Sequence, residues 1–189
     1  MLLLIKYTLL YGIVLMLVAL GGMFSEHSGI INIALEGIMV IGGVAGVLTL
    51  TMLPSSMSPA LVVLISILVA ALAGVVYSLL LAFASINLKA DQTIGGTALN
   101  LLAPAIVLFL VNILFRQSSL NLKYDAPSWF MLFKTDFGFE RKQDIGVIGE
   151  VLLNKVYLTT YIGIALYIVL SIILYKTKFG LRLRACGEH

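Results

Sequence analysis

Long apolar stretches alternate with short polar ones through most of the chain, and a longer polar stretch precedes the last of them. A helix needs about 20 mostly apolar residues to cross a bilayer, and within lipid its backbone must satisfy its own hydrogen bonds. The pattern therefore predicts an all-α fold, a polytopic transmembrane helix bundle of about five spans, one of them broken or re-entrant. The predicted spans cover residues 2–24, 29–53, 60–84, 92–115 and 156–175.

Composition supports a membrane protein, because 61% of the 189 residues are hydrophobic and 11% are charged. Soluble domains carry about 25% charged residues. The first span has a second interpretation, a signal peptide with Lys6 in its basic region and a cleavage site at Ala19-Leu20-Gly21. We favour a span, since another membrane segment follows after only a few polar residues.

Polar residues interrupt the apolar pattern where the second span begins, and charge at such a place is costly. On a helix, Asn32 and Glu36 would share one face because they are four residues apart. Gly42 and Gly46 form a small-xxx-small pair that lets a second helix come close. Glu36 either braces a packed helix or belongs to a broken helix whose polar interruption lines a solute pathway. We favour the pathway.

The fourth span carries polar residues at helical spacing. Pro104 has no N–H, so the carbonyl of Asn100 loses its usual helical partner. A free carbonyl beside an amide side chain suits a polar solute, although such side chains also join helices, at ~0.6 kcal/mol per contact. The candidate pathway residues are Asn32, Glu36, Gln92, Thr97 and Asn100.

The stretch 116–155 is polar, nearly neutral and rich in aromatic residues between Trp129 and Phe139. Such a cluster is typical of a membrane–water interface, and the alternative is a docking surface for a soluble partner. The segment 176–189 is basic, so the positive-inside rule predicts that it is cytoplasmic. Counting back through five spans places residue 1 and the loop 116–155 outside. If 29–53 is re-entrant, the parity of everything before that segment changes.

The chain contains no G-x-x-x-x-G-K-[ST] phosphate loop, so we expect no ATP site here. Neither His27 nor His189 has a second ligand at metal spacing, and no nucleophile has a base nearby. We therefore predict no catalytic residue, metal or cofactor. A transport subunit is favoured; the alternatives are a membrane-embedded enzyme using Glu26, His27 and Glu36, and a structural membrane protein.

Three separated blocks resemble the permease subunits of ABC importers in the nucleoside and simple-sugar branch, relatives of the ribose permease. The upstream block comprises Gly21, Gly22, Phe24, Ser25, Glu26, Ser28, Gly29, Asn32, Ile33, Leu35, Glu36 and Gly37. The second comprises Ala90, Asp91, Gln92, Gly96, Thr97, Ala98, Leu99 and Asn100. The third resembles the coupling segment and comprises Phe179, Gly180, Leu181, Arg184, Ala185, Gly187 and Glu188.

The resemblance implies a permease domain over 1–175 and a cytoplasmic coupling segment over 176–189, in a multi-pass protein of the plasma (inner) membrane. It implies a separate ATP-binding ATPase subunit, a second permease subunit, an extracytoplasmic solute-binding protein and membrane lipid as partners, and no nucleic acid. The solute would be a nucleoside or a simple sugar. Because such permeases continue through further spans, we expect an N-terminal fragment or a truncated product. The residues that it assigns to ATPase coupling are Phe179, Gly180, Leu181, Arg184, Gly187 and Glu188.

Overall fold

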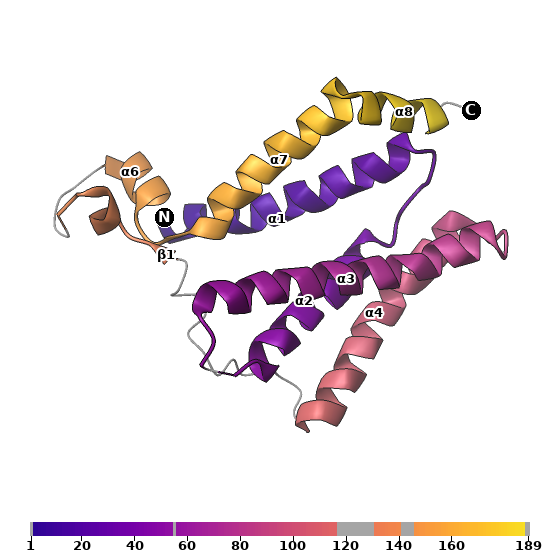
Figure 1. Ribbon diagram of the computed structural model, residues 1–189, viewed down its shortest axis with the longest axis horizontal. Helices are drawn as coiled ribbons and strands as arrows, with labels where there is room; N and C mark the ends of the chain where they lie inside the picture. The colour runs from indigo at the N-terminus through magenta and orange to yellow at the C-terminus, as the bar shows by residue number, and fades with distance from the viewer. Residues whose placement is uncertain (1, 55, 117–130, 141–145, 188–189) are drawn as a thin grey trace. The chain divides into compact units, whose positions relative to one another are not determined.

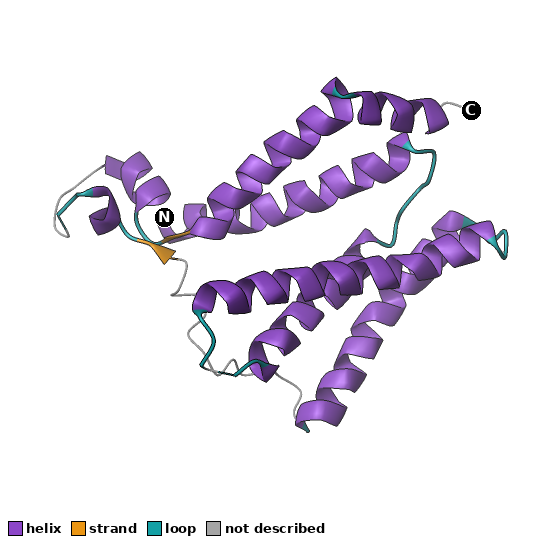
Figure 2. Ribbon diagram, viewed as in Figure 1, coloured by secondary structure: helices purple, strands orange, loops and turns teal. Residues whose placement is uncertain are grey.

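The computed structural model describes residues 2–54, 56–116, 131–140 and 146–187. These residues are almost entirely helical, with one sheet of two short strands among them (Figure 2). The prediction of an all-α bundle is confirmed by five helices that are long and apolar enough to cross a membrane. They are α1 (Leu2–His27), α2 (Leu35–Met52), α3 (Pro59–Ile86), α4 (Gln92–Phe115) and α7 (Leu158–Lys176) (Figure 1).

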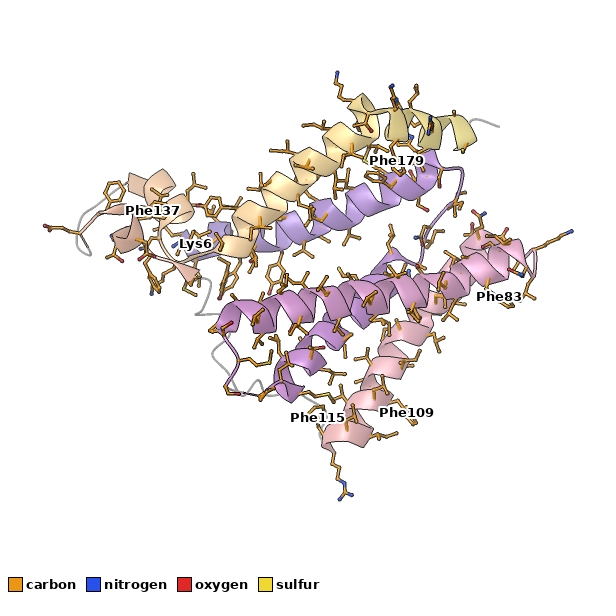
Figure 3. All side chains as sticks on the ribbon, viewed as in Figure 1. Lys6, Phe83, Phe109, Phe115, Phe137 and Phe179 are labelled. Carbon is orange, nitrogen blue, oxygen red and sulfur yellow. The ribbon has the colours of Figure 1, made fainter. Side chains whose placement is uncertain are left out.

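Large apolar side chains project outward from these helices, as Phe83 on α3 and Phe109 on α4 do in Figure 3. Their exposed fractions are 57% and 65%. In water such exposure of contiguous apolar surface would favour aggregation, whereas lipid accepts it. The outward faces of the helices therefore fit a bilayer.

The chain divides into two compact units, the first built from Met1–Leu20 and Asp125–Arg184. In this unit α1 and α7 pack side by side, and a Cβ on Gly163 would lie 2.5 Å from Cγ2 of Ile13. Lys6 donates a hydrogen bond of 2.6 Å from Nζ to the carbonyl of Asn154, just before α7 begins. Later residues of α1 thus pair with later residues of α7. The two helices run in the same direction.

The first unit also contains a small cap that precedes α7. It contains β1 (Met131–Leu132), η1 (Lys134–Phe137), α6 (Gly146–Leu153) and β2 (Val156–Tyr157), and the two strands pair antiparallel. Lys134 and Glu150 form an ion pair of 2.7 Å, and Asn154 donates a hydrogen bond of 2.5 Å to the same carboxylate. Both bonds lower the pKa of Glu150, and the hydrogen bond from Asn154 has the larger effect. Of the predicted aromatic cluster, Trp129 and Phe130 lie outside the described residues, whereas Phe133 and Phe137 are exposed.

The second unit comprises Gly21–Tyr124 and Ala185–His189, and α2, α3 and α4 pack within it. A Cβ on Gly42 would lie 3.0 Å from the carbonyl oxygen of Ala70 on α3, and one on Gly46 would lie 3.3 Å from Ala70 Cβ. The predicted close packing through Gly42 and Gly46 is confirmed. The core beside this contact consists of Ala34, Tyr77, Leu81, Leu99 and Ala103.

The second span begins later than the sequence pattern predicted. Residues 28–34 are not helical, and α2 starts at Leu35. Gly29 has a φ of 83°, which favours glycine, and the side-chain oxygen of Asn32 accepts a hydrogen bond of 3.1 Å from the N–H of Ala34. Because this local bond competes with helix formation, the prediction that Asn32 and Glu36 share a helical face is wrong.

Candidate functional site: the entry segment and the basic tail

Two amide side chains of α4 hold the non-helical segment 28–34, here called the entry segment. Gln92 accepts a hydrogen bond of 2.8 Å at Oε1 from the N–H of Ile31. Asn100 donates one of 2.7 Å from Nδ2 to the carbonyl of Ile33, and its Oδ1 accepts another of 2.7 Å from the N–H of Gly37. A segment without helical hydrogen bonds needs such partners where water is scarce.

Two glycines allow the entry segment to come this close to α4. A Cβ on Gly96 would lie 3.1 Å from the backbone nitrogen of Ala34, and one on Gly37 would lie 3.0 Å from the carbonyl oxygen of Leu99. Tyr77 on α3 donates a hydrogen bond of 2.6 Å to that same carbonyl. The backbones meet closely enough for short amide side chains to bridge them.

These contacts bring the five predicted pathway residues into one region of the second unit. The surroundings of the five side chains differ. Asn32, Gln92 and Asn100 are half-buried and bonded to backbone groups. The bonds of Gln92 and Asn100 fit the helix-joining interpretation of amide side chains, whereas that of Asn32 is local. Glu36 and Thr97 are exposed. Glu36 lies in the first turn of α2, where the helix dipole favours negative charge. Thr97 donates a hydrogen bond of 2.8 Å to the carbonyl of Thr93.

Two supporting features were not predicted from the residues alone. Asp91 caps α4, accepting hydrogen bonds of 2.7 Å and 3.1 Å from the N–H groups of Thr93 and Ile94, and these bonds lower its pKa, with that from Ile94 having the larger effect. An aspartate directly before a helical pattern is a known cap signal that could have revealed this. Ser25 closes the turn after α1 by donating a hydrogen bond of 3.0 Å to the carbonyl of Ile30.

The predicted coupling segment forms a separate helix, α8 (Lys178–Gly187), directly after α7. Gly180 is buried against the carbonyl of Leu174, so a side chain there would overlap the end of α7. Phe179 and Leu181 are exposed, and the guanidinium of Arg184 lies 5.8 Å from the ring centre of Tyr175. Glu188 lies outside the described residues.

The end of α8 contacts the turn that leads into the entry segment, and both belong to the second unit. A Cβ on Gly187 would lie 2.5 Å from the carbonyl oxygen of His27 and 2.7 Å from the nitrogen of Gly29. Only a residue without a side chain fits this position unless the backbone moves. The last residues of the predicted coupling segment therefore contact the turn that precedes the entry segment.

These features define a polytopic membrane protein in which polar side chains lie beside the non-helical entry segment. Residues 4–189 match the family described as the permease component of branched-chain amino acid transport systems, and the chain belongs to this family. The predicted resemblance to ABC permeases is thereby confirmed. Together with the five apolar helices, it makes the chain a multi-pass plasma-membrane protein.

Relatives with known names are similar over almost the whole chain. The guanosine ABC transporter permease protein NupQ of Bacillus subtilis is 41% identical over 182 residues, 96% of this chain and 54% of the relative. The nucleoside ABC transporter permease protein NupC of Lactococcus lactis is 38% identical, with the same two coverages. A putative glucose ABC transporter permease protein of Haloferax volcanii, TsgC13, is 24% identical over 93% of this chain and 48% of the relative. The chain spans about half the length of these relatives, and no solved structure matches it.

Proposed function

We propose that the chain is a membrane-spanning permease subunit of an ATP-driven importer and that its solute is a nucleoside. Family membership supports the permease role. The two relatives named for guanosine and nucleoside transport are 41% and 38% identical, against 24% for the one named for glucose. This order favours a nucleoside over a simple sugar. The observation that carries the mechanism is the attachment of the entry segment to α4.

The tail sets the proposed orientation. Its basic residues favour a cytoplasmic position, so α7 would begin outside, and the parallel α1 would begin outside too. At 1.5 Å per residue, the 26 residues of α1 extend about 39 Å, more than the ~30 Å hydrocarbon core. The entry segment that follows α1 would therefore lie towards the cytoplasmic surface, at the inner mouth of the pathway.

At this mouth, we assign two roles to four of the five polar residues. Gln92 and Asn100 hold the entry segment in place through their backbone hydrogen bonds. The exposed Glu36 and Thr97 face the solute. A carboxylate accepts hydrogen bonds from ribose hydroxyls or base N–H groups, and a threonine hydroxyl both donates and accepts them. Such groups suit a nucleoside, which is polar and uncharged.

The partners follow from the same proposal. A separate ATPase subunit binds ATP and docks on α8, where Phe179 and Leu181 offer exposed apolar side chains and Arg184 a cation. A movement of α8 would reach the entry segment through the contact of Gly187 with the turn at Gly29. A second permease subunit completes the pathway. The loop 116–155 lies outside and receives the solute-binding protein.

Uptake measurements with the assembled transporter test this function. Cells that carry the complete transporter should accumulate labelled guanosine, and cells that lack this chain should not. Excess unlabelled nucleoside should compete and excess glucose should not. Uptake of glucose alone would replace the nucleoside by a sugar. A chemically altered solute, formed without net uptake, would support a membrane-embedded enzyme instead.

A further inference from the structure

An apolar cavity of about 210 Å³ lies in the first unit, where α1 and α7 begin. Leu10 on α1, Val151 on α6 and Ile164 on α7 form part of its walls, and Lys6 and Lys155 also line it. Pockets for drug-sized ligands measure roughly 300–1,000 Å³ and present several polar groups. This cavity is smaller and mostly apolar, so it suits a narrow hydrocarbon chain better than a nucleoside.

The position of the cavity along the helices indicates a membrane surface. Lys6 lies in the second turn of α1, and Lys155 directly precedes β2 and α7. Both lysines thus lie near the starts of two parallel helices. Tyr7, Tyr157 and Tyr161 line the same cavity. Tyrosine and lysine concentrate where the hydrocarbon core meets the lipid headgroups, with apolar side chains deeper in the bilayer.

The charges of the lining residues favour an anion beside the cavity. Nζ of Lys6 donates one hydrogen bond to the carbonyl of Asn154, and its ammonium group has two further N–H donors. Glu150, on the neighbouring helix, is already bonded to Lys134 and Asn154. Among the described residues no carboxylate pairs with Lys155. Two cations therefore flank an apolar space.

We propose that this cavity binds one anionic phospholipid. Part of an acyl chain lies between Leu10 and Ile164, and the headgroup phosphate contacts Lys6 and Lys155. Ammonium groups donate hydrogen bonds to phosphate oxygens and attract their negative charge. The inference needs α1 and α7 to cross the membrane, and it does not depend on which solute the protein carries.

Lipid retention tests the proposal. The transporter is purified, transferred to nanodiscs of phosphatidylcholine with a minor fraction of phosphatidylglycerol, and its bound phospholipid is identified by native mass spectrometry. The unaltered protein should retain phosphatidylglycerol. Lys155→Gln should lower its affinity about fivefold, the factor that corresponds to ~1 kcal/mol per lysine near a membrane surface. Lys89→Gln removes the same charge between α3 and α4 and should have no effect.

A second variant separates the acyl chain from the charge. Leu10→Trp fills the cavity while both lysines remain, and it should displace the lipid. Equal retention by the Lys155 and Lys89 variants would overturn the proposal, as would phosphatidylcholine bound as tightly as phosphatidylglycerol. An unaltered protein that retains no phospholipid would also overturn it.

Discussion

Asn100 on α4 and Gly37 at the start of α2 are joined by a hydrogen bond of 2.7 Å between the side-chain oxygen and the backbone N–H. The nitrogen of the same side chain bonds to Ile33 in the entry segment. One side chain thus fixes both the first turn of a helix and the irregular backbone before it. The geometry of the entry segment depends on that bridge.

Replacing Asn100 by Leu removes the amide but keeps a side chain of similar size, so it should destabilise the protein. Two hydrogen bonds at ~0.6 kcal/mol each predict a loss of about 1.2 kcal/mol in the free energy of unfolding. Asn112→Leu, the same change in an exposed position of α4, is the control. Denaturant unfolding of the purified protein measures both. Equal effects would contradict the bridging role.

The glycines of α2 give a second matched comparison. Gly42→Ala places a methyl group 3.0 Å from the carbonyl oxygen of Ala70, whereas Gly43→Ala meets nothing within 4 Å. Overpacking costs about 1–3 kcal/mol, and alanine in open helix gains up to ~1 kcal/mol. The melting temperature should fall for Gly42→Ala and stay unchanged or rise for Gly43→Ala. The opposite order would disprove the packing of α2 on α3.

The sequence predicts some of these structural features and not others. The length of the apolar stretch and the polar residues at its two ends predict α4, which begins after the capping Asp91 and ends at Phe115. The start of α2 was predicted six residues too early. Hydropathy contains no information on the left-handed backbone conformation of Gly29 or on the local hydrogen bond of Asn32. Pairings such as Gln92 with Ile31 join residues 61 positions apart, and no periodicity in a single sequence encodes them.

The cap of the first unit should be sensitive to acid. Because its hydrogen bonds lower the pKa of Glu150, their stabilising effect is present above the ordinary glutamate pKa of 4.5. It is lost as the pH falls through the lowered value. Hydrogen exchange in residues 131–157 should therefore accelerate in acid for the unaltered protein. Glu150→Gln should remove this dependence, and the exposed Glu26→Gln should retain it. Identical profiles would show that Glu150 contributes nothing.

The tail contact predicts a loss of coupling from a small change. Gly187→Ala introduces a methyl group 2.5 Å from the carbonyl oxygen of His27, so the tail must shift. ATP-driven uptake should fall severalfold, while the amount of protein in the membrane stays constant. The neighbouring Cys186→Ala, at an exposed position, is the control. Full uptake by Gly187→Ala would reduce the tail to a topological anchor.

Chemical labelling of cysteines tests the solute pathway most directly. In a Cys186→Ala background, single cysteines replace Glu36 and Thr97 in the assembled transporter, and Leu64 and Leu79 on α3 in matched controls. All four positions are exposed in the isolated chain. A water-soluble thiol reagent should modify the first two, and guanosine should slow that reaction. The controls should stay unmodified because they face lipid. Equal protection at all four positions, or modification that guanosine does not slow, would contradict the pathway.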